Sequence, residues 1–337
     1  MSQSWITIPY RELDHGSFDE EWLPHKKSSG WWYITGYLTD KENSSQLYSF
    51  QYTVIQARMY GITTYMLHMG LTDFQEESHL FKQKIQLRKK KNVRVNQDEI
   101  AYEPYTRLIK EQKQFKLTMA TTEFNLNLVM QKGKGAFWHC DNGVLIMGLI
   151  DDPDQRTVYY SYTNLPTEGT LVIRNKSQTR TLEVVGKSWF DRQWGPYRLL
   201  DADSHWEWFS FRFFDDEEIM LFSFPKQPYI DGTYINKQGQ TTRLQNYEIK
   251  PKEFIKVGRY NYTFSYGWDV IIPGIKEERY EIKPLMKGQL NIAYFEMMAE
   301  LLNAEGKRVG YCFIELLSGA RNKIRLYQQI SQLLKKS

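Results

Sequence analysis

The chain has 337 residues, enough for two domains or one very large one, and its 25% charged and 41% hydrophobic residues are typical of a globular protein. A net charge of +4 is too small to indicate nucleic-acid binding. No apolar run is long enough to span a bilayer and no signal peptide is visible, so the sequence predicts a cytoplasmic protein.

Aromatic residues make up 15% of the chain, which favours β structure because rings fit the pleated, half-buried surface of a sheet. Along the first half, alternating apolar and polar residues or glycine-bounded aromatic runs predict strands over 30–38, 48–59, 63–69, 124–130, 144–149, 158–163 and 169–173. From Glu76 to about Thr118 the pattern weakens and charge rises. This segment is expected to be a helical insertion or an irregular excursion between strands.

Gly186 opens a second series of short strands. Strands are predicted over 206–214, 218–224, 260–264, 267–272, 289–298 and 308–316. Apolar residues at helical spacing over Arg321–Lys336 predict a C-terminal amphipathic helix. Many short strands without alternating helices indicate an all-β protein of barrels or sandwiches. The expected domains are 1–185 and 186–337.

Motifs of common enzyme chemistry are missing. Gly186-Lys187-Ser188 lacks the earlier glycine of a phosphate loop, because Thr181 stands at that position. The sequence has neither G-x-S-x-G nor H-E-x-x-H, and its six histidines are scattered, so no metal is predicted.

The two cysteines, Cys140 and Cys312, are expected to be buried free thiols, with a disulfide between the domains left as the alternative. The basic run Lys82–Arg94 is read as a solvated loop or face, or as a peripheral contact with an anionic membrane surface.

Six aromatic and polar clusters remain, in this order: Gly30-Trp31-Trp32-Tyr33-Ile34-Thr35-Gly36, His68–Asp73, Tyr159-Tyr160-Ser161, Gly186–Gly195, His205–Phe209 and Gly310–Leu316. As an ordered set they resemble the carotenoid 1,2-hydratase family, also called hydroxyneurosporene synthase-like, which includes kievitone hydratase-like proteins and decalin-forming cyclases. The resemblance implies two lipocalin-like (calycin) antiparallel β-barrels packed side by side. It also implies a ligand cavity in or between the barrels, and no cofactor.

The sequence departs from the hydratase branch at two places. That branch carries a histidine two places before the second tryptophan of the Gly186–Gly195 cluster, and here Arg192 stands there. It also carries a Tyr-x-Asp on a later strand, where this chain has Met220-Leu221-Phe222.

Asp191 is the leading candidate for a catalytic acid. If Trp189 and Trp194 flank it, desolvation raises its pKa, which suits protonation of an alkene, and the indole faces stabilise the resulting cation. The alternative is that Asp191 pairs with Arg192, or with another arginine, and only locks the domain junction. Glu315, flanked by Ile314 and Leu316, is a second acid if it is buried. The predicted catalytic set is therefore Asp191, Trp194 and Glu315.

Nine residues are predicted to contact a ligand: Trp31, Trp32, Tyr33, His68, Tyr160, Trp189, Trp206, Trp208 and Trp268. Because neighbouring residues alternate faces in a strand, one of Trp31 and Trp32 is expected in the barrel core. The function expected is binding of a polyene, terpenoid, polyketide or acyl chain, with hydration or cyclisation of it by protonation left open. A non-catalytic carrier and a structural interaction protein are the alternatives.

Overall fold

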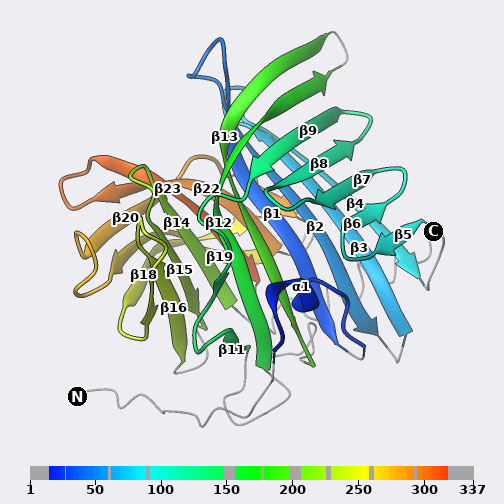
Figure 1. Ribbon diagram of the computed structural model, residues 1–337. Helices are drawn as coiled ribbons and strands as arrows, with labels where there is room; N and C mark the ends of the chain where they lie inside the picture. The colour runs from blue at the N-terminus through cyan, green and yellow to red at the C-terminus, as the bar shows by residue number, and fades with distance from the viewer. Residues whose placement is uncertain are drawn as a thin grey trace. The chain divides into compact units, whose positions relative to one another are not determined.

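The computed structural model describes residues 15–26, 28–59, 62–87, 92–147, 156–175, 178–196, 206–224, 229–257, 262–287, 289–291 and 294–317. These residues form two compact units. The first unit comprises Leu13–Trp138 with Thr157–Pro196, and the second contains the described residues of His139–Arg156 and Tyr197–Ser337. Each unit is built on one curled antiparallel sheet with its own hydrophobic core (Figure 1), as expected for a lipocalin-like domain.

The sheet of the first unit has the order β4-β3-β2-β1-β13-β12-β9-β8-β7-β6-β5. Its strands are β1 (Ser29–Asp40), β2 (Leu47–Met59), β3 (Ile62–Asp73), β4 (Ser78–Leu87), β5 (Val93–Val95), β6 (Glu99–Tyr102), β7 (Thr106–Lys110), β8 (Gln114–Ala120), β9 (Phe124–Gln131), β12 (Arg156–Arg174) and β13 (Thr179–Gly195). The short strand β10 (Phe137–Trp138) also pairs with β12. One short helix, α1 (Phe18–Glu21), precedes the sheet.

The sheet of the second unit has the order β17-β16-β15-β14-β23-β22-β20-β19-β18. Its strands are β14 (Trp206–Phe213), β15 (Glu218–Ser223), β16 (Ile230–Ile235), β17 (Thr241–Leu244), β18 (Glu248–Val257), β19 (Tyr262–Ile271), β20 (Arg279–Pro284), β22 (Tyr294–Asn303) and β23 (Arg308–Leu317). β21 (Leu290–Asn291) pairs with β22, and β11 (Val144–Ile146) lies in the segment before β12. The strands predicted over 206–214 and 218–224 correspond to β14 and β15, which pair as a hairpin.

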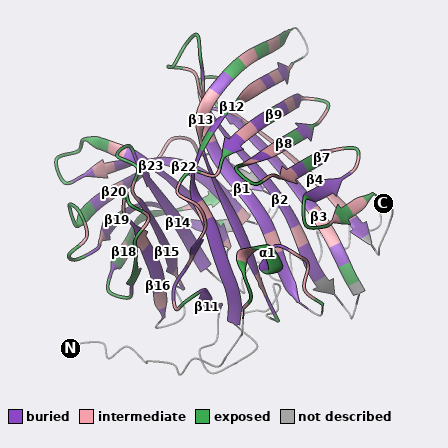
Figure 2. Ribbon diagram, viewed as in Figure 1, coloured by how far each residue is buried: buried purple, intermediate pink, exposed green. Residues whose placement is uncertain are grey.

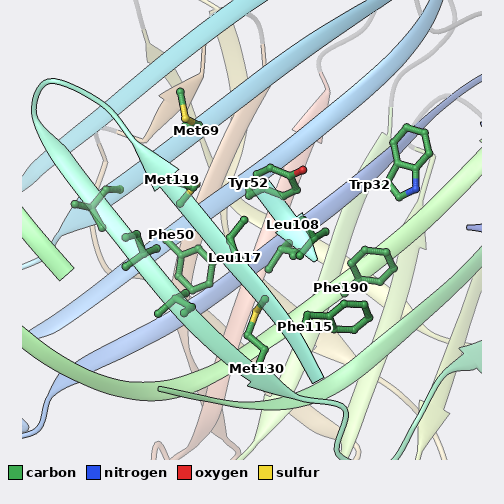
Figure 3. Close-up of a cluster of buried hydrophobic side chains, with 14 of the residues drawn as sticks. Trp32, Phe50, Tyr52, Met69, Leu108, Phe115, Leu117, Met119, Met130 and Phe190 are labelled. Carbon is green, nitrogen blue, oxygen red and sulfur yellow. The ribbon is translucent and has the colours of Figure 1, made fainter. Parts of the chain in front are cut away.

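The core of the first unit is filled by the inward side chains of its strands (Figure 3). On β8, the buried residues Phe115, Leu117 and Met119 alternate with outward residues, as period two requires. Burial in Figure 2 follows the same division, with β1 and β14 buried along most of their length and β18 largely exposed.

The charged segment 76–118 is not the helical or irregular insertion that its composition predicted. It forms β4 to β8, which continue the first sheet on both sides. The strands alternate as a half-buried sheet requires: on β7, buried Thr106 and Leu108 flank the exposed Arg107. The strands β5, β6 and β7 have only three, four and five residues, so each shows too few alternating positions for the period to be recognised.

The predicted division at residue 186 falls inside a strand. β13 pairs with β1 from Val184 to Gly195, so this stretch belongs to the first sheet, and the first unit ends at Pro196. Gly186 is required by close packing, because a Cβ there would lie 1.9 Å from the carbonyl oxygen of Tyr37. The glycine therefore marks a close approach of two strands. The predicted helix over 321–336 lies outside the described residues.

Candidate functional site

The two faces of β13 carry different chemistry. Phe190 and Arg192 point toward the hydrophobic core, whereas Trp189, Asp191 and Gln193 point to the opposite face of the sheet. This second face, which we call the Asp191 face, continues across the paired strands through Tyr33 on β1 and His68 on β3. The side chains on it are buried although many are polar: Asp191 is 4% exposed, Gln193 1% and His68 6%.

Asp191 is held by hydrogen bonds from three neutral donors. The indole Nε1 of Trp189 donates to Oδ1 of Asp191 at 2.5 Å, and the Tyr159 hydroxyl donates to the same oxygen at 3.0 Å. The Ser161 hydroxyl, directly across on β12, is the third donor. A buried carboxyl group with this many donors is fixed in one orientation, because each donor restricts the plane of the carboxyl.

A transverse row of paired residues connects Asp191 to a histidine. Asp191 pairs with Tyr33, Tyr33 with Thr53, and Thr53 with His68, so the four side chains lie on the Asp191 face. Adjacent strands are about 4.8 Å apart, so three strand steps separate Asp191 and His68 by roughly 14 Å along the sheet. The strands of the row, β13, β1, β2 and β3, lie side by side in Figure 1.

His68 is neutral at physiological pH. Burial lowers the pKa of its imidazole to about 4, and a hydrogen bond with Gln83 only partly opposes that shift. The ring also meets Phe81 edge-on, with 5.3 Å between the ring centroids. A neutral imidazole keeps one nitrogen able to accept a proton, so the row has a carboxyl group near one end and a base near the other.

Arg192 is a structural residue on the core side and is not the partner of Asp191 that the sequence left open. Its guanidinium lies 4.3 Å above the Trp32 ring, and burial lowers its pKa to about 10. It donates to the backbone carbonyls of Glu21 and Leu23 at 2.9 and 2.8 Å, which ties the α1 segment to the sheet. The departure from the hydratase pattern at position 192 therefore falls outside the Asp191 face.

The prediction that Trp194 flanks Asp191 is wrong, because Trp194 lies an odd number of residues away and points to the other face. Its indole donates to the Glu21 carboxylate at 2.6 Å and stacks on His25 with 3.5 Å between centroids. Tyr160 is also on the core side, where its hydroxyl donates to the Phe18 carbonyl.

Trp31, Trp32 and Tyr33 alternate faces as predicted. Trp32 is fully buried in the core, and Trp31 and Tyr33 lie on the opposite face. Four predicted residues thus share the Asp191 face with Asp191 itself: Trp31, Tyr33, His68 and Trp189.

The second unit brings together Trp206, Trp208 and Glu315 on the face opposite its core. Trp206 Nε1 donates to Glu315 Oε1 at 2.7 Å, and Trp208 lies directly across from Glu315. Glu296 pairs with Glu315 from the other side. Burial raises the pKa of Glu315, although hydrogen bonds with Trp206 and Glu296 lower it in part.

Trp268 lies apart from that group, inside the core of the second unit, against Phe209 at 5.3 Å. The same interior holds Glu207, whose carboxylate accepts a hydrogen bond from Ser265. Burial raises the pKa of Glu207. Sequence reasoning missed Glu207 because a carboxyl group in a strand gives no sign of which face it occupies.

The sequence analysis also did not identify Tyr159 and Ser161 as site residues, because it selected Tyr160 from the same motif. Neighbouring residues of a strand alternate between faces, so Tyr160 lies on one face and its two neighbours on the other. Only the pairing of β12 with β13 shows that the neighbours meet Asp191.

Both cysteines are buried free thiols, as predicted, and burial raises the pKa of each. In the basic run, Lys82 forms an ion pair with Glu123, and Arg94 pairs with Glu99 at 3.0 Å. Residues 88–91 of the run lie outside the described residues. Among the described ranges, no three His, Cys, Asp or Glu side chains gather to hold a metal ion, and no helix is long and apolar enough to cross a membrane.

Comparison with known proteins places this arrangement in a family. The AttH-like family model matches residues 10–319. The crystal structure of an AttH protein from Nitrosomonas europaea superposes with a TM-score of 0.79 at 19% identity, covering 91% of this chain and 98% of that chain. Kievitone hydratase from Nectria haematococca gives a TM-score of 0.67 at 16% identity, covering 86% and 89%. No curated protein sequence matches. The two structures establish the shared fold. The family match, which spans nearly the whole chain, shows that this protein belongs to the AttH-like family.

Proposed function

We propose that the chain binds a hydrophobic small molecule on the Asp191 face and hydrates or cyclises it by proton transfer, without a cofactor. The observation that carries this proposal is the buried, triply hydrogen-bonded Asp191 in one transverse row with a neutral His68. A carboxyl group and an imidazole are the side chains most suited to donating and accepting protons near neutral pH.

The chemistry assigned to the row is addition of water to a carbon–carbon double bond. Protonated Asp191 donates its proton to one alkene carbon, and the electron pair of the double bond forms the new C–H bond. Water then adds to the carbocation on the neighbouring carbon, and the Asp191 carboxylate takes back the proton that the water loses. Asp191 is thereby regenerated, so the net change is the addition of one water molecule. In a cyclisation, a second double bond attacks the cation in place of water.

The aromatic residues of the face support this chemistry. The rings of Trp189 and Tyr33 share it with Asp191, and aromatic faces stabilise cations. Likeness to a protein named kievitone hydratase supports a hydratase-type reaction as well.

The test starts from the ligand. Native mass spectrometry of the protein purified from its own host, followed by extraction, identifies a retained apolar molecule or its product. The protein is then incubated with the identified alkene in H₂¹⁸O and in D₂O. Hydration places one ¹⁸O and one carbon-bound deuterium in the product, whereas cyclisation places deuterium alone.

Asp191→Asn is expected to abolish label incorporation while ligand binding persists, because the amide keeps the shape but donates no acidic proton. Asp269→Asn is the matched control, since Asp269 is an exposed residue of the second unit paired with Lys252. Binding without turnover in the wild type would identify a carrier. Equal turnover in Asp191→Asn and wild type would refute the assignment of the acid.

A further inference from the structure

A cavity of about 920 Å³ in the first unit lies apart from the Asp191 face. It opens beside α1, the turn between β7 and β8, and the loop that follows β9. Its lining includes Phe18, Lys110, Lys132 and Tyr162. Tyr162 packs against the hydrophobic core of the unit. The cavity is open to solvent, and its volume is in the range of small-molecule sites.

Lys132 is the unusual group in this cavity. Its ammonium nitrogen lies 4.8 Å from the centroid of the Phe115 ring and 5.5 Å from that of Tyr162. Across the ranges that the structure describes, no carboxylate forms an ion pair with it. Burial lowers the pKa of Lys132, and the charge of nearby Lys110 lowers it further. The charge of Asp19 acts in the opposite direction and raises the pKa of Lys132. A half-buried cation that packs on rings without an ion pair is poorly solvated and gains from an anion.

Lys110, a neighbouring lysine in the same cavity, differs from Lys132 because it forms an ion pair. It also lies over a ring, 4.9 Å from the centroid of Trp22, but it is paired with Asp19 at 2.8 Å. Its charge is therefore already balanced. Four lysines and three acidic residues line the cavity, a formal balance of +1. This balance fits one negative charge and disfavours a polyanion, which the acidic residues would repel.

The backbone holds Lys132 in a fixed place. Its amide donates to the Lys113 carbonyl at 2.9 Å, and its carbonyl accepts from Gly135 at 2.8 Å. The next residue, Gly133, has φ +45°, and a Cβ there would lie 2.0 Å from the Asn164 carbonyl oxygen. The turn is thus pressed against β12, where only glycine fits. An ammonium group on such a turn is positioned before a ligand arrives, which lowers the entropy cost of binding.

The rings beneath the lysine form a continuous apolar layer. Phe115 stacks on Phe190 at 5.3 Å, as Figure 3 shows, and on Trp22 at 6.0 Å. Tyr162 meets Phe115 edge-on at 5.1 Å. The cavity therefore offers the ammonium group of Lys132, which forms no ion pair within the described ranges, at the edge of an aromatic surface.

We propose that this cavity binds an organic carboxylate with an apolar body, whose carboxylate pairs with Lys132 and whose body lies against Phe18 and Tyr162. The site does not depend on the function proposed for the Asp191 face, because none of its lining residues lies in the Asp191 row.

The test uses sodium octanoate as the probe and isothermal titration calorimetry on the full chain. 1-Octanol has the same body without the charge, acetate has the charge without the body, and inorganic phosphate carries more charge. We expect octanoate to bind at least tenfold more tightly than octanol, acetate or phosphate. Phosphate binding as tight as that of octanoate, or octanol binding as tight, would overturn the proposal.

Lys132→Met removes the charge and keeps the length of the side chain. It should weaken octanoate binding at least tenfold and change octanol binding less than twofold. Lys250→Met is the control, because Lys250 is an exposed lysine of the second unit that does not line the cavity, and it should alter octanoate binding less than twofold. Since loss of a half-buried charge can itself affect folding, Lys132→Arg is added and should retain most of the affinity. Unchanged octanoate binding in Lys132→Met would refute the site.

Discussion

Replacing Arg192 with methionine isolates the role of the buried guanidinium. The substitution keeps an unbranched side chain over Trp32 but leaves four backbone carbonyls without this donor: those of Glu21, Leu23, Trp31 and Gln193. A buried acceptor that loses its donor costs about 1–3 kcal/mol, so the four together cost roughly 6 kcal/mol.

The burial cost of the cation offsets part of that loss. The pKa of Arg192 falls from 12.5 to about 10, which corresponds to roughly 3 kcal/mol against the charged form in the folded state. Methionine removes this cost. The net expectation is a loss of about 3 kcal/mol in the free energy of unfolding, in line with the penalty for breaking a buried charged network.

Urea denaturation followed by far-ultraviolet circular dichroism measures this change. Arg107→Met, at an exposed position in the same sheet, is the control and should cost less than about 1 kcal/mol, the usual value of a surface ion pair. A free energy of unfolding for Arg192→Met within 1 kcal/mol of the wild type would refute the reasoning. It would mean that the carbonyls find other partners once the guanidinium is gone.

Two further predictions concern pH and burial. The pKa of His68 is about 4 in the folded state and 6.5 in the unfolded state, so the free energy of unfolding should fall by up to about 3 kcal/mol as pH drops from 6.5 to 4. His68→Gln should make the free energy of unfolding less dependent on pH, as measured by urea denaturation at a series of pH values. Equal slopes in the two proteins would contradict the assignment. Burial raises the pKa of Glu207 above its usual 4.5. The free energy of unfolding should therefore fall as pH rises from 4.5 through the folded pKa, because the carboxylate is charged while buried. Glu207→Gln removes that charge and should raise the melting temperature at pH 7. A lower melting temperature in calorimetry would show that the carboxylate is needed.

The strands were predictable wherever apolar and polar residues alternate over enough positions. This was the case for β2 and β9, whose bounds nearly match the prediction. The strands in segment 76–118 were harder to predict, because β5, β6 and β7 each contain at most five residues and show little of the alternating pattern. Gly186 was misread as a boundary because close strand packing and a turn both call for glycine.

The sequence could predict only which side chains share a face of one strand, because neighbouring residues alternate between faces. This alternation places Trp189 on the same face as Asp191 and Trp194 on the other face, a distinction that the prediction overlooked. The contact of Tyr159 with Asp191 depends on the register of β12 against β13. The place of His68 in the same row depends on register across three further strand pairs. A single sequence carries no record of register, because a shift of two residues leaves the same side chains on the same face.

The pairing of β1 with β13 has a consequence for synthesis of the chain. β1 forms twelve residue pairs with β13, and β13 ends at Gly195, long after β1 ends at Asp40. At translation rates of about 5–20 residues per second, β1 waits roughly 8–30 s for this partner. During that time β1 can be sheltered on one edge only, by β2, and its other edge exposes unpaired amides and carbonyls. The nascent chain thus carries an open strand edge during most of the synthesis of its first unit, and such an edge can pair with another chain.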